Sequence, residues 1–312
     1  MLTIYKTTEQ GLQQVEQPTK GCWINAVGPS PEEINQLVEW GFDPDLITYS
    51  LDLDEMAHLE KDEDDGYTFV LVRIPYYQGD LSDIPFSTAP LGIIILKGEL
   101  VATICRFDSD IVRVLGNSKY RGLRTGKRYR FVLYALLETA TRFLSNLREI
   151  NKTVEILEDK LQKSTRNHEL LELLKYQKSL TYFISSLRSN ELMLERLHRA
   201  KMFNQYEDDQ ELLEDVMTEN QQALQMTRIA SDILSSMMDA FASIISNNVN
   251  TVMKVLTALT IILSLPTMIT SFYGMNVGLP LGGHPLAYLF ILIVSLVLVG
   301  ITILIFAKLD WF

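Results

Sequence analysis

The stretch VMKVLTALTIILSLPTMITSFYGMN, at positions 252–276, decides the fold of this chain. It opens a long region, residues 255–307, in which the only side chain that ionises near neutral pH is that of His284. A helix needs about 20 apolar residues to cross the hydrocarbon core of a bilayer. The region therefore predicts two membrane-spanning helices, at about 252–272 and at 286–307.

The linker between the two spans, residues 274–285, is rich in Gly and Pro and too short to hold a domain. The spans therefore form an antiparallel hairpin, with both chain ends on one side of the membrane. Lys254 and Lys308 flank the spans on that side, whereas the linker has no Lys or Arg, and positive charge favours the cytoplasmic side. The opening residues MLTIYK contain no apolar signal segment. We expect an inner (plasma) membrane protein with a cytoplasmic N-terminal region, an external loop and a cytoplasmic tail at 308–312.

The region before the first span is long and acidic. The chain has 312 residues and a net charge of −11, almost all of it in this region. Such a region is large enough for a core of its own. Its acidity argues against nucleic-acid binding and suits either the attraction of cations or simple solubility. Cys22 and Cys105 stand in neither a metal-binding nor a redox spacing, so both are predicted to be buried thiols.

Residues 1–128 are predicted to form a cytoplasmic α/β domain. A helix should open at Ser30-Pro31-Glu32-Glu33, because Ser caps free amides, Pro tolerates the first helical position and carboxylates meet the positive end of the helix dipole. The basic stretch Lys119–Arg130 marks the exit from the domain and is read as a solvated turn; a polyphosphate or nucleic-acid site there would lack an aromatic platform. The candidate strands, rich in Ile, Val and Tyr, are Thr3–Lys6, Cys22–Val27, Tyr67–Arg73, Leu91–Leu96 and Leu100–Cys105.

Residues 129–273 contain no glycine, and apolar residues recur there at three- and four-residue steps, which predicts long helices. Breaks near Ser164–Asn167 and near Phe203–Asp209 separate an antiparallel helical pair, residues 129–209, from a third helix. The third helix, residues 210–273, starts behind acidic residues and continues into the membrane. It is therefore expected to form both a stalk and the first span.

One line along this third helix is polar inside the membrane. Steps of three and four residues back from Ser271 reach small or polar residues with one exception, Met253. A hydroxyl or amide in a bilayer needs a partner or water, and a period near 3.5 keeps one line facing the axis of a helix bundle. The line predicts either the lining of an aqueous pore or a close-packed contact between helices. This polar line consists of Asp239, Ser243, Ser246, Asn250, Met253, Thr257, Thr260, Ser264, Thr267 and Ser271.

Tyr273-Gly274-Met275-Asn276 directly follows the polar line. The tripeptide Gly-Met-Asn after Tyr, between two C-terminal membrane helices at the end of a long stalk, resembles the signature of the CorA family of divalent-cation channels. The resemblance covers the whole architecture and is densest from Asn250 to Asn276. It implies a funnel-shaped homopentamer in the membrane that conducts hydrated Mg²⁺, with Co²⁺ and Ni²⁺ as other cargo. Gly274, Met275 and Asn276 would form its selectivity filter.

The resemblance implies roles for the residues along the pore. Five Asn276 carboxamides would accept hydrogen bonds from the waters of an intact aqua ion, because Mg²⁺ releases its water reluctantly. Gly274 would let the helix end, and Met275 would pack behind the carboxamides. Met253 and Leu256 would form an apolar constriction that stops ions by dewetting.

Gating by intracellular Mg²⁺ is also implied by the resemblance. The ion would bridge acids on neighbouring subunits, with Asp215 on the stalk and either Asp80 or Asp83 in the α/β domain as ligands. Bound metal would screen carboxylates that otherwise repel one another, and its loss would loosen the closed state. Mg²⁺ is thus expected as both cargo and regulator, without an organic cofactor. The expected metal ligands are Asp80, Asp83, Asp215, Asp239 and Asn276.

Two features depart from the family pattern. Many members have an acid shortly after the tripeptide, whereas this chain reads VGLPLGGH at 277–284, so the outer mouth lacks a carboxylate. His284 would repel cations there below about pH 6.5. The C-terminal KLDWF replaces a basic cluster, although Trp311 can anchor at the membrane interface.

Three other functions compete with a magnesium channel. The zinc-transporting branch of the family shares Gly-Met-Asn followed by Val-Gly, so a zinc transporter coupled to a proton gradient is the nearest alternative. The polar line offers oxygen but no Cys or His, which argues mildly against zinc. A membrane-anchored structural coiled coil would give the polar line no role. An enzyme has the least support, because no phosphate loop or nucleophile motif appears and the histidines are scattered at His58, His168, His198 and His284.

Overall fold

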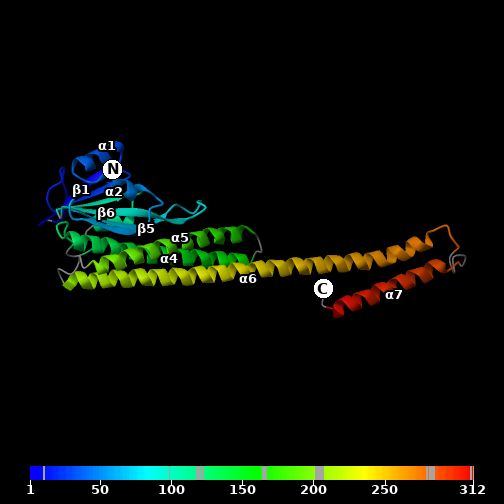
Figure 1. The fold of residues 1–312 in the computed structure, drawn as a ribbon. Helices are drawn as coiled ribbons and strands as arrows, with labels where there is room; N and C mark the ends of the chain where they lie inside the picture. Colours follow the sequence, from blue (N-terminus) through cyan, green and yellow to red (C-terminus); the bar gives the residue numbers. More distant parts are fainter. Residues whose placement is uncertain are drawn as a thin grey trace. The chain divides into compact units, whose positions relative to one another are not determined.

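The computed structural model divides into two compact units, Met1–Ser236 and Met237–Phe312 (Figure 1). One helix, α6 (Glu207–Tyr273), runs through both units. The structure describes residues 1–9, 11–97, 99–116, 120, 123–163, 167–200, 207–278, 280, 285–309 and 311.

A seven-stranded sheet with the order β2-β1-β3-β7-β6-β5-β4 forms the centre of the first unit. β3 and β7 pair in parallel, and the other neighbouring strands pair antiparallel. All five predicted strands are confirmed, and β5 and β6 are longer than predicted. β2 and β4 were missed because they are short edge strands with polar sequences, which carry little hydrophobic signal. The strands are β1 (Leu2–Thr8), β2 (Gly11–Gln14), β3 (Cys22–Val27), β4 (His58–Asp62), β5 (Tyr67–Tyr77), β6 (Phe86–Leu96) and β7 (Leu100–Cys105).

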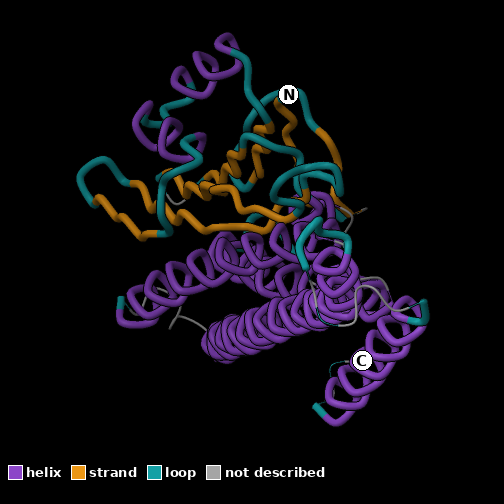
Figure 2. The backbone as a smooth tube through the Cα atoms, turned by 90° about the vertical axis from the view of Figure 1, so that its right-hand side faces the viewer, coloured by secondary structure: helices purple, strands orange, loops and turns teal. Residues whose placement is uncertain are grey.

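Helices cover both faces of this sheet (Figures 1 and 2). β5 shows how the sequence directs side chains to the two faces, because alternate residues of a strand point in opposite directions. Phe69 and Leu71 belong to an apolar cluster that includes residues of α1 and α2, whereas Val70 and Val72 belong to a second cluster that includes residues of α3, α4, α5 and α6. The helices of this unit are α1 (Pro31–Glu39), α2 (Pro44–Leu51), α3 (Asp110–Gly116), α4 (Arg128–Lys163), α5 (Asn167–Arg199) and the first part of α6.

The helix expected at Ser30 begins there as α1, with Pro31 as its first residue. Ser30 Oγ accepts a hydrogen bond from the N–H of Glu33 at 3.3 Å, and the Glu33 carboxylate accepts one from the N–H of Ser30 at 2.9 Å. The N-terminal ammonium group also donates to this carboxylate, and it holds the pKa of Glu33 below its ordinary value. The reciprocal bonds satisfy amides that the first turn leaves free.

Both cysteines are free and buried, as predicted. They lie on neighbouring strands, Cys22 at the start of β3 and Cys105 at the end of β7. Burial raises the pKa of the Cys105 thiol to about 11, so the group stays neutral and packs as a small apolar side chain.

The long helices follow the predicted breaks. α4 ends at Lys163 and α5 begins at Asn167, while α5 ends at Arg199 and α6 begins at Glu207. α6 therefore begins three residues before the start that the sequence predicted, at about Gln210. The acids read as preceding the helix lie inside its first turn, where negative charge is favourable.

The basic stretch Lys119–Arg130 does not end as a solvated turn, and that interpretation is wrong for its last residues. α4 begins at Arg128, and the side chain of Arg130 is only 17% exposed. Arg130 forms ion pairs with Asp208 at 3.2 Å and with the buried Asp209, both in the first turn of α6. Its charge therefore connects the start of α6 to α4 rather than facing a ligand. Lys119 lies outside the described residues.

A side-chain amide of α5 completes the hydrogen bonding of β5. The ladder between β4 and β5 ends at the pair His58 and Leu71, before it reaches Arg73. Asn190, which is 1% exposed, takes the place of the missing strand. Its Oδ1 accepts from the N–H of Arg73 and its Nδ2 donates to the carbonyl of Arg73, both at 2.8 Å. The amide thereby holds α5 against the sheet.

Asn190→Ala should therefore destabilise the protein strongly. The substitution leaves a buried N–H and a buried carbonyl without partners, at a cost of about 2–4 kcal/mol in the free energy of unfolding. Thermal unfolding of the purified protein should show a clearly lower midpoint. Asn151→Ala, at an exposed position of α4, is the matched control. Equal midpoints for the two variants would show that the bonds to Arg73 contribute nothing.

Candidate functional site

The second unit contains the C-terminal part of α6 and all of α7 (Ala287–Lys308). Both helices are long and apolar enough to cross a membrane. Within this unit, α7 runs in the direction opposite to α6 (Figure 1). These are the two helices in which the sequence placed its spans.

The C-terminal part of α6 has a sheltered side and an exposed side. At 3.6 residues per turn, the sheltered positions fall on one side of the helix and the polar line falls on the other. Ala258, with 0% exposure, lies near the middle of the sheltered side. All residues of the polar line from Met253 to Ser271 are exposed, so no described part of the chain covers it. The sheltered positions are Val255, Ala258, Ile261, Ile262, Leu265, Pro266, Ile269 and Tyr273.

Three hydroxyl groups of the polar line, those of Thr260, Ser264 and Thr267, donate their hydrogens to α6 itself. Because the hydrogen is used within the helix, the lone pairs of each hydroxyl oxygen remain available to accept hydrogen bonds from outside. The line can therefore bind groups that donate hydrogen bonds, such as water molecules held by a metal ion. The donor hydroxyls reach backbone carbonyl oxygens at 2.8–2.9 Å, from Thr260 to Leu256, from Ser264 to Ile261 and from Thr267 to Leu263.

On the N-terminal side of the span, the polar line continues along α6 with exposed residues at the same spacing. Asp239, Ser243, Ser246 and Asn250 are all exposed on α6. Between these residues and the hydroxyl groups lie two bulky apolar side chains, Met253 and Leu256, which are 53% and 56% exposed. Their exposure shows that neither belongs to a core within this chain.

The tripeptide lies directly beyond the end of α6 at Tyr273. The N–H of Gly274 donates to the carbonyls of Thr270 at 2.9 Å and of Ser271 at 3.2 Å, so the last turn tightens. The helix thus ends directly before Gly274, as expected, although the backbone of Gly274 is not in the left-handed region. The Asn276 side chain is exposed.

Gly274 has room for a side chain within its own chain. A methyl group there would lie 3.4 Å from the carbonyl oxygen of Thr270 and 3.5 Å from that of Ser271, which are ordinary contacts. Contacts with the residues that the structure describes therefore do not require glycine at this position.

The predicted gating acids have different surroundings. Asp80 lies beyond β5 and accepts a hydrogen bond from the Tyr77 hydroxyl at 2.8 Å, which raises the pKa of Tyr77. Asp83 lines a pocket together with Lys175 and Lys178 of α5. Asp215 is exposed on α6.

The β5–β6 hairpin and Asp215 lie at different levels of the first unit. The hairpin meets α5 at Ser179, whose Oγ accepts from a backbone N–H of β6 at 3.2 Å. Beside this point, Gln177 of α5 donates to Ser231 and Ser235 of α6 at 3.1 and 2.9 Å. These serines are 16 and 20 residues beyond Asp215 (231 − 215 and 235 − 215), which is about 24–30 Å along a helix. One chain therefore does not bring Asp80 or Asp83 to Asp215.

Within the described ranges, no group of three or more His, Cys, Asp or Glu side chains is placed to hold a metal ion. The four expected acidic ligands, Asp80, Asp83, Asp215 and Asp239, therefore belong to no such group within these ranges. His284 lies outside the described residues.

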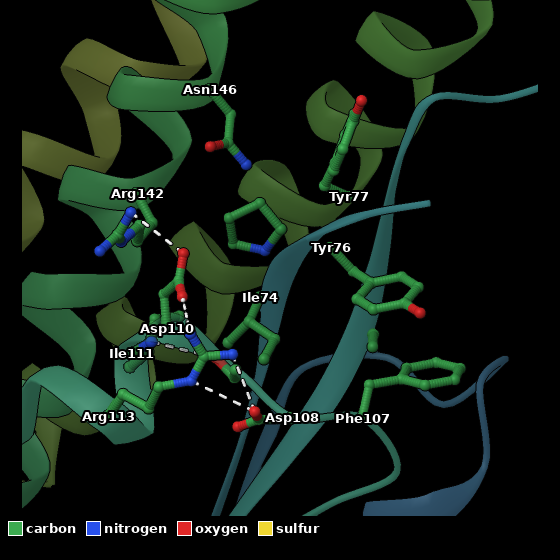
Figure 3. Close-up of a pocket in the computed structure, with 13 residues that line it drawn as sticks. Ile74, Tyr76, Tyr77, Phe107, Asp108, Asp110, Ile111, Arg113, Arg142 and Asn146 are labelled. Carbon is green, nitrogen blue, oxygen red and sulfur yellow. Dashed lines mark hydrogen bonds and ion pairs between the residues drawn. The ribbon is translucent and has the colours of Figure 1, made fainter. Parts of the chain in front are cut away.

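Sequence reasoning missed a polar pocket in the first unit, with a volume of about 230 Å³ (Figure 3). Arg142 and Asn146 of α4 and Asp110 and Arg113 of α3 line it. The only local signal was the spacing of Arg142 and Asn146, four residues apart on one helix. Such a pair is usual on a solvated helix face, so it gave no reason to expect a cavity.

The chain matches known proteins over almost its whole length. The family model described as CorA-like Mg²⁺ transporter protein matches residues 19–308. The cobalt/magnesium transport protein CorA of Methanocaldococcus jannaschii is 30% identical over 300 residues, which are 93% of this chain and 90% of the relative. The cobalt/magnesium transport protein CorA of Thermotoga maritima is 25% identical over 290 residues, 87% of this chain and 78% of the relative.

A solved structure confirms the predicted fold class of an α/β domain, a long helix and an apolar C-terminal helix. The complete structure of the CorA magnesium transporter from Methanocaldococcus jannaschii matches with a TM-score of 0.84 at 24% identity, over 100% of this chain and 99% of that one. The family model covers five of the seven strands, β3 to β7, as well as the long helices and the two apolar helices. This chain therefore belongs to the family of CorA-like Mg²⁺ transporter proteins.

Proposed function

We propose that this chain is one subunit of an oligomeric channel that carries hydrated Mg²⁺ into the cytoplasm, with Co²⁺ and Ni²⁺ as other cargo. The names of its relatives as cobalt/magnesium transport proteins support the choice of ion. The observation that carries the proposal is the position of the polar line, which is exposed on the side of α6 opposite its sheltered positions and ends at Gly-Met-Asn. Several copies with their polar lines facing a common axis would enclose an aqueous path.

The chemistry of the polar line suits an ion that keeps its water. Mg²⁺ dehydrates reluctantly, so the water molecules around it present hydrogens to the pore wall. Hydroxyl oxygens whose own hydrogens are donated to the backbone accept from those waters. Zinc, by contrast, favours Cys and His ligands, and the polar line contains neither.

The Gly-Met-Asn tripeptide is the proposed selectivity filter. The described residues leave space for a side chain at Gly274. In this proposal, neighbouring copies or the passing ion would leave no room for a side chain larger than that of glycine. Five Asn276 carboxamides, in the pentamer that the family resemblance implies, would accept hydrogen bonds from the waters of the aqua ion. A neutral ring of this kind holds the ion without trapping it.

The proposed topology places both chain ends in the cytoplasm. The α/β domain at 1–128, the helical pair at 129–209 and the stalk from 210 onward would lie there, and the loop at 274–285 would lie outside. Met253 and Leu256 would form the apolar constriction near the inner side of the membrane.

Intracellular Mg²⁺ is the proposed gating ligand. Because Asp215 is about 24–30 Å along α6 from the level of the β5–β6 hairpin, Asp80 or Asp83 would have to come from a neighbouring copy to share an ion with it. Binding between copies would hold their stalks together, and loss of the ion would release them.

Ion flux into liposomes that contain the purified protein tests the proposed function. We expect entry of Mg²⁺ that does not require a pH gradient and exceeds entry of Zn²⁺. Zinc entry that depends on a pH gradient, with little Mg²⁺ entry, would assign the chain to zinc transport. A protein that assembles but passes neither ion would instead be a structural membrane protein.

Asp215→Asn should weaken inhibition by intracellular Mg²⁺. Couplings between a ligand site and a conformational change are typically worth 5- to 150-fold, so we expect half-inhibition to need roughly tenfold more internal Mg²⁺. Flux would be recorded from proteoliposomes loaded with increasing Mg²⁺. Glu211→Gln, at an exposed position one turn earlier on α6, is the matched control and should retain inhibition. An unchanged half-inhibition in Asp215→Asn would remove this residue from gating.

A further inference from the structure

The pocket of Figure 3 lies apart from the polar line, in the α/β part of the first unit. Its volume of about 230 Å³ is lined by α3, α4, the end of β5, Ala89 of β6 and the loop between β7 and α3. The rings of Tyr76 and Phe107, stacked at 4.2 Å between centroids, form part of its apolar wall. Opposite them, α4 contributes the side chains of Arg142 and Asn146 (Figure 3).

Of the two guanidinium groups in the pocket, that of Arg113 forms hydrogen bonds with two neighbouring acids. Its Nε and Nη2 donate to Asp108 at 3.2 and 2.8 Å, and its Nη1 donates to Asp110 at 3.0 Å. The hydrogen bonds to Asp108 raise the pKa of Arg113. Arg113 therefore fixes the loop before α3 and uses three of its five N–H groups to do so.

Arg142 differs because its donors are not satisfied. The guanidinium lies 3.3 Å from Asp110 and 3.5 Å from the buried Glu138, and it makes no hydrogen bond to any residue that the structure describes. The side chain is only 30% exposed, so water has limited access to its five N–H groups. Arg142 is thus paired by charge with two acids but hydrogen-bonded to neither, so its N–H groups can still donate to a ligand.

Asn146 adds a second donor one turn along the same helix face. It follows Arg142 by four residues, and its carboxamide reaches into the pocket (Figure 3). Like Arg142, it forms no hydrogen bond within the described part of the chain. The two side chains thus present converging donors to one small space.

We propose that this pocket binds a small oxyanion, either a phosphate or a short-chain carboxylate, through Arg142 and Asn146. Guanidinium groups hold carboxylate and phosphate oxygens in pairs, and the carboxamide N–H₂ supplies a further donor. The pocket is smaller than the roughly 300–1,000 Å³ of sites for drug-sized ligands, so a whole nucleotide does not fit.

Asp110 acts as a competitor for the bound anion. It shares its carboxylate between Arg113 and Arg142, and an incoming oxyanion would displace it from Arg142 while its bond to Arg113 remains. With the buried Glu138 beside Arg142 included, three carboxylates face two guanidinium groups, so charge alone does not attract an anion to the pocket. Affinity is therefore set by the hydrogen bonds, and removal of Asp110 should increase it.

Thermal unfolding and calorimetric titration of the purified full chain, without Mg²⁺, test this proposal. Sodium phosphate and sodium succinate are compared with sodium chloride at equal ionic strength. A ligand that binds the folded state raises the unfolding midpoint by mass action. We expect a saturable rise with phosphate, succinate or both, beyond that with chloride. A response to phosphate alone identifies a phosphate site, and a response to succinate alone identifies a carboxylate site.

Variants assign the response to the pocket. Arg142→Gln should abolish it, Asn146→Ala should weaken it severalfold and Asp110→Asn should strengthen it. Arg188→Gln, an exposed arginine of α5 paired with Glu191, is the control and should respond fully. Equal effects of all three salts, or a full response in Arg142→Gln, would overturn the proposal. If Arg142→Gln fails to fold because Glu138 loses its counter-charge, an unchanged response in both Asn146→Ala and Asp110→Asn would overturn it instead.

Discussion

Asn276→Ala is expected to abolish selective Mg²⁺ flux while leaving expression and assembly intact. The side chain is exposed in the chain, so its removal should cost the fold little. The proposed filter, however, loses one acceptor in each of five copies. At about 1 kcal/mol for each hydrogen bond to the aqua ion, the combined loss reaches several kcal/mol, or more than about a hundredfold in affinity. Flux into proteoliposomes, with Mg²⁺ and Zn²⁺ compared, measures the change.

The control for this prediction removes the same carboxamide elsewhere on α6. Asn248 is exposed and lies two residues from both Ser246 and Asn250, which places it on the side of the helix opposite the polar line. Asn248→Ala should therefore keep full flux and full selectivity. If Asn276→Ala also transports Mg²⁺ at the normal rate, the carboxamide takes no part in the mechanism.

The elements that could be predicted from the sequence are those with a strong local pattern. The two spans follow from the lack of charge in residues 255–307, and α6 follows from the steps of three and four residues along it. β5 was found because its first half is rich in Val, Leu and aromatic residues, as is usual for a strand buried on both faces. β4, with the sequence HLEKD, has no such pattern and is identified only by its pairing with β5.

The candidate site also has some features that could be predicted from a local pattern and others that could not. The polar line depends on the helical period alone, so its residues could be placed on one face of α6 from spacing. The backbone conformation of Gly274 could not be predicted from the sequence. The N–H of Gly274 donates to the carbonyls of Thr270 and Ser271, and the glycine does not adopt the left-handed conformation. A residue type permits a conformation but does not require it.

Contacts between distant segments were the least predictable part. Asn190 meets Arg73 across 117 positions of sequence, and nothing near either residue indicates that an amide replaces a strand there. The same holds for Arg130, which was read as solvated although it pairs with acids at the start of α6. Such polar side chains look like ordinary surface residues until the tertiary structure brings their partners to them.

Leu256→Ser is expected to increase flux at high internal Mg²⁺, when the normal channel is closed. The side chain is 56% exposed in the single chain, so no core within the subunit is lost. In the proposed assembly it belongs to the apolar constriction, which blocks ions because water leaves a narrow apolar passage. A hydroxyl in each copy would keep this passage wet. A barrier lower by only 1.4 kcal/mol would raise the flux about tenfold.

Leu259→Ser is the matched control, because Leu259 is 48% exposed on the same helix but lies off the polar line. The two variants place the same hydroxyl three residues apart, about 60° around α6 and nearly one turn along it, so they differ mainly in the level of the helix that becomes polar. If closure depends on water leaving the passage at Leu256, only Leu256→Ser should conduct at high internal Mg²⁺. Equal leakage from both variants would point to general loosening of the bundle, and the constriction would then have to lie elsewhere along α6.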